Sequence, residues 1–172
     1  MARNVEIKAR VGEPALLLAR VRALAERGPV EILQDDTFYP CASGRLKLRI
    51  LADDEGQLIH YHRADATAPK ESRYTIVATA APHALRETLA QALGTRGRVR
   101  KKRTLFLVGP TRIHLDDVEG LGHFMEIEVV LGENQTAAEG ISIARDLMRQ
   151  LGIGDDQLVD RAYVDLLAHD AR

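Results

Sequence analysis

Apolar and charged residues alternate along several stretches of this chain, a pattern typical of β-strands whose two faces meet different surroundings. The first stretch covers residues 3–11 and ends at Gly12. Pro14 then suits the first turn of an amphipathic helix, which the run Arg27-Gly28-Pro29 stops. The same alternation predicts three further strands, over residues 30–39, 45–51 and 57–63.

The order of elements is then predicted a second time. A strand over residues 71–79 is followed by a helix from Pro82 to Gly94. Three more strands come next, over residues 98–108, 111–117 and 123–131. Two helices end the chain: Thr136 and Glu139 form a capping box for the first, and the second covers residues 155–168. The pattern indicates an α+β protein made of two strand-helix-three-strand halves.

Charged residues share one face of these strands. In the stretch GRLKLRI, Arg45, Lys47 and Arg49 alternate with apolar side chains. Comparable faces are formed by Glu6, Lys8 and Arg10, by Lys101 and Arg103, by Arg112, His114 and Asp116, and by Glu126 and Glu128, while Arg63 ends the fourth strand. Any one of these strands, taken alone, would be an ordinary antiparallel strand with its polar face in water.

Taken together, the strands favour a closed barrel instead. Basic residues recur from strand to strand with few acids among them, so the charged faces could line the inside while the apolar faces and helices lie outside. Buried like charges require a partner of opposite charge. We therefore expect a polyanion inside the barrel and a divalent cation that bridges it to the carboxylates.

Composition narrows the class of protein. A chain of 172 residues suits one domain over residues 1–172, and its 45% hydrophobic and 28% charged residues are typical of a globular protein. The 24 basic and 25 acidic residues argue against general nucleic-acid coating. A single cysteine favours a reducing cytoplasm, and no apolar run is long enough to span a bilayer. We expect no nucleic-acid or membrane partner, and leave a homodimer open.

The stretch NVEIKAR resembles the E-x-E-x-K signature of the CYTH superfamily, also called triphosphate tunnel metalloenzymes. Further stretches follow in the order typical of its class IV adenylate cyclase branch: QDDTFY, GRLKLRI, IHYHR, PKESRY, VRKKR, LDDVEGLGHFMEIE and RAYVDLL. This resemblance covers nearly the whole chain. It implies a tunnel of about eight antiparallel strands with helices outside, which binds a triphosphate together with Mg²⁺ or Mn²⁺.

The resemblance also implies site residues. Positions that match the family's triphosphate-binding residues are Lys8, Lys47, Arg49, Arg63, Lys101, Arg103 and Arg112. Those that match acidic residues near the metal are Glu6, Asp116, Glu126 and Glu128. Lys70, expected in a loop, could reach the ligand or be solvated. Asn4 stands where the signature has its first glutamate, and its amide oxygen could ligate Mg²⁺ without adding charge. No residue is assigned as the catalytic acid or base.

Other candidate sites are weaker. His60 and His62 share a strand face but have no third ligand nearby, so packing or surface roles are favoured over a metal site. Cys41 has no evident base partner and is interpreted as structural or incidental. The stretch RGRVRKKR could be a nucleic-acid patch, but alternation turns Lys101 and Arg103 to one side and Arg100 and Lys102 to the other.

Three functions remain open at this point. The resemblance favours an adenylate cyclase, which converts ATP into cyclic AMP and pyrophosphate. A triphosphatase acting on thiamine triphosphate, inorganic triphosphate or a nucleoside triphosphate would need the same phosphate clamp. A nucleotide-binding or polyphosphate-binding module without turnover is the alternative that Asn4 favours.

Overall fold

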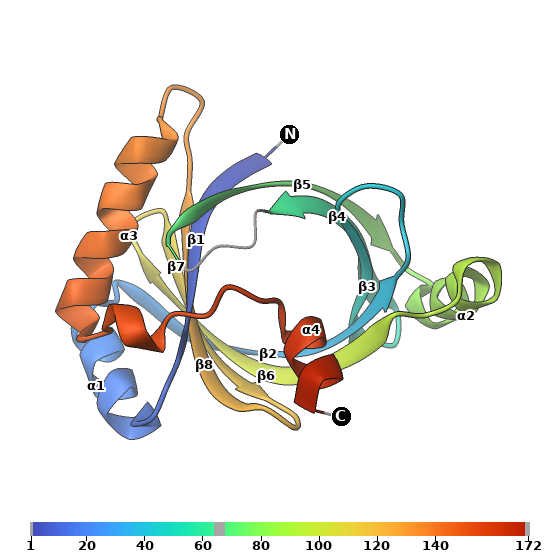
Figure 1. Ribbon diagram of the computed structural model, residues 1–172, viewed down its shortest axis with the longest axis horizontal. Coiled ribbons are helices and arrows are strands. Elements are labelled where there is room, and N and C mark those ends of the chain that lie inside the picture. Colours follow the sequence, from blue (N-terminus) through green and yellow to red (C-terminus); the bar gives the residue numbers. More distant parts are fainter. Residues whose placement is uncertain (1, 64–67, 171–172) are drawn as a thin grey trace.

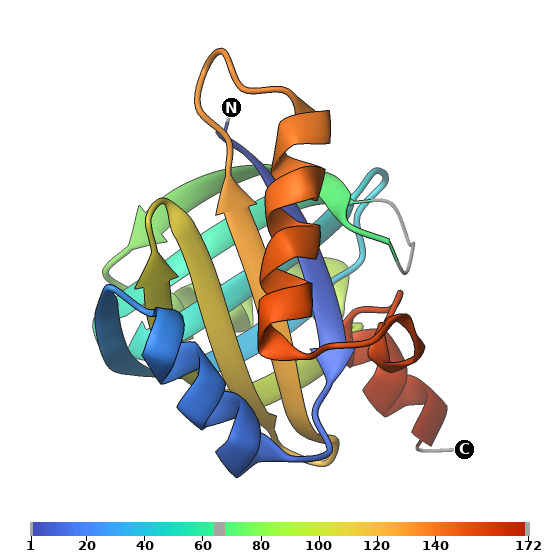
Figure 2. The same cartoon turned by 90° about the vertical axis from the view of Figure 1, so that its left-hand side faces the viewer.

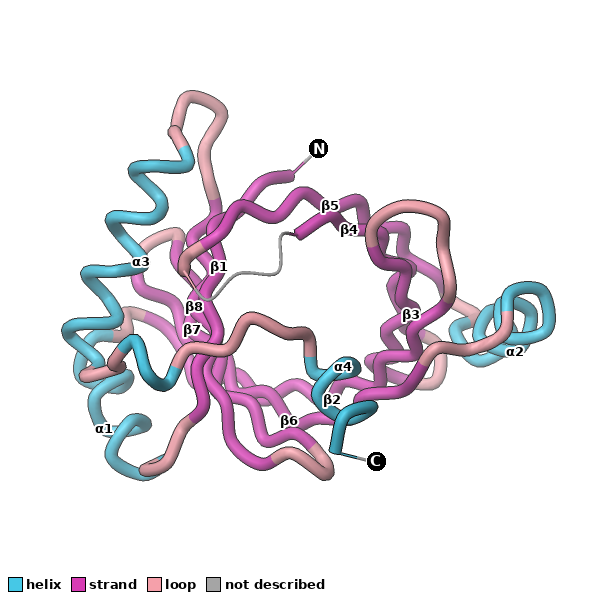
Figure 3. The backbone as a smooth tube through the Cα atoms, viewed as in Figure 1, coloured by secondary structure: helices cyan, strands magenta, loops and turns pink. Residues whose placement is uncertain are grey.

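The strands of the protein close into one antiparallel barrel with the helices outside it (Figures 1 and 3). The computed structural model describes residues 2–63 and 68–170. Its eight strands are hydrogen-bonded in the order β1-β5-β4-β3-β2-β6-β7-β8, and β8 pairs with β1 to close the ring. The predicted α+β barrel of two strand-helix-three-strand halves is confirmed.

The first half consists of β1 (Ala2–Arg10), α1 (Pro14–Leu24), β2 (Arg27–Tyr39), β3 (Arg45–Ala52) and β4 (Glu55–Arg63). The second consists of β5 (Lys70–Thr79), α2 (Pro82–Leu93), β6 (Gly97–Val108), β7 (Thr111–Val118) and β8 (Gly122–Val130). They are followed by α3 (Ala137–Leu151), a short 3₁₀ helix (Asp155–Gln157) and α4 (Tyr163–Asp170).

Strand register places charge inside the barrel and apolar side chains outside it. Across the β1–β8 ladder, Glu6 pairs with Glu128 and Lys8 with Glu126. Because successive side chains of a strand point to opposite faces, the intervening Ile7 and Ile127 point outward. Both isoleucines are buried, so the outer face of this part of the barrel is itself a core surface.

Helices α1 and α3 cover that outer surface, as Figure 2 shows. Leu17 and Val21 of α1, and Leu147 and Leu151 of α3, belong to the same buried cluster as the outward residues of β1, β7 and β8. At Gly140 in α3, an added Cβ would lie 2.8 Å from Val5 Cγ2, so glycine allows the helix to approach β1 closely. The apolar contacts that stabilise the barrel therefore lie outside it.

The capping box expected for α3 is present. Thr136 Oγ1 accepts a hydrogen bond from the backbone N–H of Glu139 at 3.2 Å, and Glu139 Oε2 accepts one from the backbone N–H of Thr136 at 2.7 Å. This reciprocal pair satisfies amide groups that the first turn of a helix leaves without partners.

The prediction of a last helix over residues 155–168 is wrong for the first half of that range. Only Asp155–Gln157 form a 3₁₀ turn, and α4 begins at Tyr163. The backbone between them is held by β1, because Leu158 forms a bridge with Ala9 and the Val159 N–H donates to the Lys8 carbonyl oxygen. Pairing with β1 carries the chain across one end of the barrel. Within the described residues, no helix is long and apolar enough to cross a membrane.

Replacing Leu151 with alanine should lower the free energy of unfolding by about 2–5 kcal/mol, because the side chain is fully buried between α3 and the barrel. Leu33→Ala is the matched control, since Leu33 is 70% exposed on the outer face of β2. Urea denaturation of both variants measures the difference. Equal stability of the two variants would contradict the assignment of the core to the outside of the barrel.

Candidate functional site

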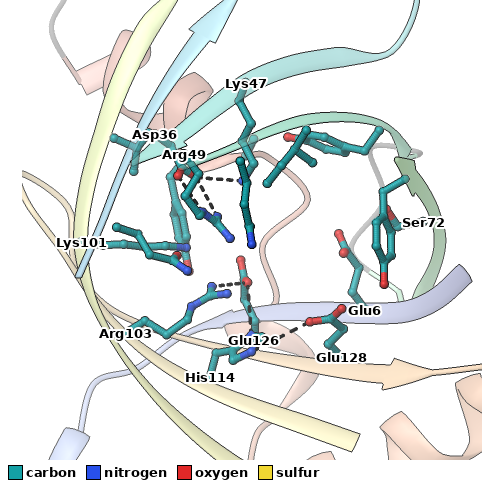
Figure 4. A pocket seen from close by; sticks show the side chains of 18 of the residues that line it. Glu6, Asp36, Lys47, Arg49, Ser72, Lys101, Arg103, His114, Glu126 and Glu128 are labelled. Carbon is teal, nitrogen blue, oxygen red and sulfur yellow. Dashed lines mark hydrogen bonds and ion pairs between the residues drawn. The ribbon is translucent and has the colours of Figure 1, made fainter. Parts of the chain in front are cut away.

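A cavity of about 540 Å³ runs inside the barrel and is lined by side chains from all of its strands. Figure 4 shows basic and acidic side chains that point toward one another across it. Ala162 and Tyr163, from the segment that crosses the end of the barrel, also contribute to its wall. A volume of this size is in the usual range for a small-molecule site.

Most of the predicted site residues meet in this cavity. The basic residues that line it are Lys8, Lys47, Arg49, Lys101, Arg103 and Arg112, and the expected acids that line it are Glu6, Glu126 and Glu128. Arg63 and Lys70 lie on β4 and β5, so Lys70 belongs to a strand and not to the expected loop. The side chains of Arg63 and Lys70 lie outside the described part of the structure.

Asp36, on β2, holds two cations of the neighbouring strand. Its carboxylate accepts a hydrogen bond from Lys47 Nζ at 2.8 Å, and bonds from Arg49 Nε and Nη2 at 2.8 Å each. The register explains the contact, because Asp36 pairs with Arg49 across the β2–β3 ladder. Burial alone would raise the pKa of Asp36, but Arg49 and Lys47 hold it well below its usual range, so the carboxylate remains ionised.

Asp116, on β7, holds two cations of β6 in the same way. It accepts hydrogen bonds from Lys101 Nζ at 3.0 Å, from Arg103 Nε and Nη2 at 2.7 and 2.6 Å, and from the Tyr163 hydroxyl at 3.0 Å. Its side chain is 0% exposed and is not part of the cavity wall. Protein donors thus contact both oxygens of Asp116, and its expected place near the metal stays a prediction. Asp116 positions Lys101 and Arg103 from behind.

Burial and neighbouring positive charge lower the pKa of two lysines in the cavity. Burial and the neighbouring Arg49 lower the pKa of Lys47 to about 7, although Asp36 acts in the opposite direction. Burial and Arg103 lower the pKa of Lys101. A lowered lysine pKa means that the folded protein disfavours the positive charge of that lysine. An anion placed here would favour this charge, and the cations around the anion would stabilise it.

The acids of β8 form the opposite wall. Glu126 accepts from Arg103 Nη2 at 2.7 Å and lies 3.3 Å from Lys8 Nζ. Glu128 accepts from Asn4 Nδ2 at 2.5 Å and from Arg112 Nη1 at 3.2 Å. Burial would raise the pKa of Glu126, but Arg103 and Lys8 hold it well below its usual range. Both glutamates therefore face the cavity with protein cations beside them, and Glu126 remains ionised.

His114 lies between these two glutamates. Its Nδ1 is 3.9 Å from Glu126 Oε2, and its Nε2 is 3.9 Å from Glu128 Oε2. Burial and the charge of Arg103 keep the pKa of His114 well below its ordinary value, so the ring is neutral. Its buried Nδ1 has no hydrogen-bond partner among the described residues, which leaves a polar atom available at the cavity wall.

The donor chemistry of this wall fits a divalent cation that keeps part of its water shell. Glu6, Glu126 and Glu128 supply carboxylate oxygens, and the buried Oδ1 of Asn4 has no hydrogen-bond partner in the part of the chain that the structure describes. No group of three or more His, Cys, Asp or Glu side chains in the described residues is arranged to hold a metal ion by itself. Mg²⁺ suits such a place, because it commonly takes one or two carboxylates and completes its shell with water and phosphate oxygens.

Tyr163 closes the cavity at the end where the chain crosses it. Lys8 Nζ lies 3.8 Å from the centroid of its ring, and Lys101 Nζ lies 4.8 Å away. Burial and the charge of Glu126 raise the pKa of Tyr163 well above its ordinary value, so the hydroxyl keeps its proton. It donates a hydrogen bond to Asp116. Phe38, Val99 and Phe124 pack around the ring in a second apolar cluster.

Sequence reasoning missed Asp36 and Tyr163 as functional contacts, and it placed His114 on the charged strand face without giving it a role. Asp36 stands in the stretch QDDTFY at the same alternation as Gln34 and Phe38, so strand periodicity could have placed it inside. His114 shares its inward face with Arg112. No comparable signal marks Tyr163, because the path of the chain across the barrel end decides its place.

A CYTH domain family model matches residues 2–163, which include all strands of the described barrel and the segment across its end. The chain belongs to the CYTH domain family. Over 65 residues it is 29% identical to adenylate cyclase CyaB of Aeromonas hydrophila, which is 38% of this chain and 34% of that protein. The match therefore spans only about a third of the curated relative.

Solved structures share the CYTH fold along nearly their full length. The PH1012 protein of Pyrococcus horikoshii superposes with a TM-score of 0.84 at 22% identity, covering 95% of this chain and 99% of that one. HpAC1 of Hippeastrum, described as having a dominant triphosphatase activity, superposes with a TM-score of 0.68 at 14% identity over 99% and 96% of the two chains. At these identities the likeness establishes the fold alone.

Binding of a triphosphate at about pH 8 should take up about one proton at Lys47, because its pKa of about 7 leaves it mostly neutral in the free protein and a nearby anion raises that pKa. The proton uptake at Lys47 should be lost in Lys47→Met. In the wild type it should be smaller at about pH 6, where the lysine of the free protein is already charged. Calorimetry in buffers of different ionisation enthalpy measures it. The same uptake in wild type and Lys47→Met would refute the assignment.

Asn4→Glu should lower the melting temperature in EDTA and recover much of the loss in Mg²⁺. The new carboxylate would replace the amide that donates to Glu128 Oε1 at 2.5 Å, so like charges would meet until a divalent cation separates them. Asn134→Glu, at an exposed loop position, is the control. Thermal melts with and without Mg²⁺ test this. If both variants respond equally, Asn4 lies outside the reach of the cation.

Proposed function

We propose that this protein is a metal-dependent enzyme that acts on a triphosphate held in the tunnel. The observation that carries the proposal is the pair of cationic clamps, Lys47 with Arg49 and Lys101 with Arg103, that face an acidic wall across one cavity. Clamps of this kind match the oxygens of a polyphosphate, because guanidinium forks and ammonium groups bind phosphate oxygens well.

The first candidate reaction is that of a class IV adenylate cyclase, as in the name of the Aeromonas relative. In that reaction the ribose 3′-oxygen attacks the α-phosphorus of ATP, and the bond to pyrophosphate breaks. The basic residues would neutralise the charge that develops on the leaving pyrophosphate. Asp36 and Asp116 would contribute by holding the clamps in place before the substrate arrives, so little reorganisation accompanies binding.

The second candidate reaction is hydrolysis of the terminal phosphate, for which the name of the Hippeastrum neighbour is the specific support. Thiamine triphosphate, inorganic triphosphate and nucleoside triphosphates are its candidate substrates. The same clamps would serve, since both reactions need cations on the phosphate oxygens.

A divalent cation, Mg²⁺ or Mn²⁺, would be held by Glu6, Glu126 and Glu128, with Asn4 Oδ1 as a neutral ligand. When bound, it would supply a Lewis acid for the phosphate oxygens. Protein cations lie beside two of these carboxylates: Lys8 Nζ is 3.3 Å from Glu126, and Arg112 Nη1 is 3.2 Å from Glu128. The cytoplasmic location, the single domain over residues 1–172, the lack of nucleic-acid and membrane partners and the open homodimer stay predictions.

One assay separates these possibilities. The purified protein is incubated with Mg²⁺ or Mn²⁺ and with ATP, thiamine triphosphate or tripolyphosphate, and the products are resolved by chromatography. Cyclic AMP with pyrophosphate supports the cyclase, and inorganic phosphate supports the triphosphatase. No product from any of the three would overturn the proposal of an enzyme and leave a binding module.

Glu126→Gln and Glu128→Gln should each lower metal-dependent turnover by about a hundredfold or more, because each removes a carboxylate charge at the proposed cation position while keeping the side-chain volume. Glu133→Gln, in the exposed loop after β8, is the matched control and should turn over normally. Initial rates at saturating Mg²⁺ measure the loss, and melting temperatures check the fold. Wild-type rates in both variants would remove these residues from the site.

A further inference from the structure

One wall of the cavity differs from the rest because it is mostly apolar and aromatic. We name it the apolar panel, and its members are Leu51, Ile59, Tyr61, Tyr74 and Ile76 of β3, β4 and β5. Register makes the panel continuous, since Ile59 pairs with Ile76 and Tyr61 pairs with Tyr74 across the β4–β5 ladder. Across the β3–β4 ladder, Ile59 also pairs with Lys47, so the panel borders directly on a phosphate clamp.

The panel carries apolar surface that the folded protein leaves uncovered. Ile76 is 46% exposed although it faces the cavity, whereas its cross-strand neighbour Ile59 is only 7% exposed. Exposed isoleucine gives a phosphate chain nothing to bind, because phosphate oxygens need charge and hydrogen-bond donors. An apolar or aromatic group of the ligand would gain from covering this surface.

The panel also contains the features that hold a flat ring. Tyr61 and Tyr74 supply aromatic faces, and flat rings stack on such faces. Among the described side chains, Gln57, which pairs with Arg49 on the adjoining strand, and Ser72 are the polar ones beside the panel. Burial together with the charge of Glu128 raises the pKa of the Tyr74 hydroxyl, which therefore keeps its proton. Binding of a ring to these described residues would depend on contact and shape.

We propose that the apolar panel binds the ring-bearing organic part of the substrate, so that the tunnel selects organic triphosphates over inorganic tripolyphosphate. This inference rests on the proposed binding of a triphosphate between the clamps. The phosphates occupy the Lys47, Arg49, Lys101 and Arg103 side of the cavity, and the organic group lies on the panel of β3–β5. Ile76 is a specificity-determining residue in this arrangement.

Adjacent residues of β5 offer a matched test. Ile76 and Val77 are both exposed β-branched residues, but Ile76 lines the cavity whereas Val77, 58% exposed, is not among the lining residues and points to the opposite face of the strand. Ile76→Asn and Val77→Asn therefore make the same kind of change on opposite sides of the barrel wall. Neither side chain is buried, so both variants should fold, and melting temperatures check this.

Binding of ATP, thiamine triphosphate and tripolyphosphate is measured by calorimetry in EDTA, which prevents metal-dependent turnover. Ile76→Asn should weaken ATP and thiamine triphosphate by roughly tenfold or more while tripolyphosphate binds as to the wild type. Val77→Asn should change none of the three. Arg112→Ala, on the charged wall, should weaken all three ligands by a similar factor, because a phosphate contact carries no information about the organic group.

The outcomes separate the two levels of the argument. Equal affinity of wild type and Ile76→Asn for ATP, or an equal loss of ATP and tripolyphosphate, would overturn the panel while leaving the triphosphate site intact. Wild-type protein that binds none of the three ligands, either in EDTA or with Mg²⁺, would overturn the proposed function, and with it the panel. A loss in Val77→Asn as large as that in Ile76→Asn would show a general effect on the barrel and would also reject the panel.

Discussion

The barrel depends on the pairing of its inward cations with two buried carboxylates, Asp36 and Asp116. Each aspartate binds one lysine and one arginine of a neighbouring strand, at distances between 2.6 and 3.0 Å. An unpaired charge in such a place would cost several kcal/mol, and the cations would also repel one another. With the aspartates in place, the barrel can close around positive charge before any ligand is present.

The same pairing prepares the cavity for an anion. The aspartates hold the clamps from behind, so the cationic groups keep their positions while part of their donor capacity still faces the cavity. Burial, and after it the charge of Arg49 and Arg103, lowers the pKa of Lys47 and Lys101, so both lysines would be stabilised in their charged form by an anion. The remaining positive potential favours a polyanion, and the acids on β8 provide the place where a cation could join it.

Stability and chemistry are consequently separated by the barrel wall. The apolar contacts of Ile7, Ile127 and the helices α1 and α3 lie outside, where they can form without removing charge from the interior. If one strand shifted its register by one residue, its charged side chains would enter this outer core. The hydrophobic pattern and the site therefore require the same strand register. Inside, the panel on β3–β5 departs from this separation, and its exposed Ile76 points to ligand binding.

The order of elements and the α3 cap could be predicted from the sequence alone. So could the inward direction of Lys47, Arg103 and Glu126, because period-two alternation assigns each strand residue to a face. The sequence could not show that Asp116 lies behind the wall, since a lysine and an arginine of the neighbouring strand claim its carboxylate only after β6 and β7 pair. Nor could it place Tyr163, which sits in the expected helix. The pairing of Leu158 with Ala9 redirects the chain there, and a contact between residues so distant in sequence exists only in the folded barrel.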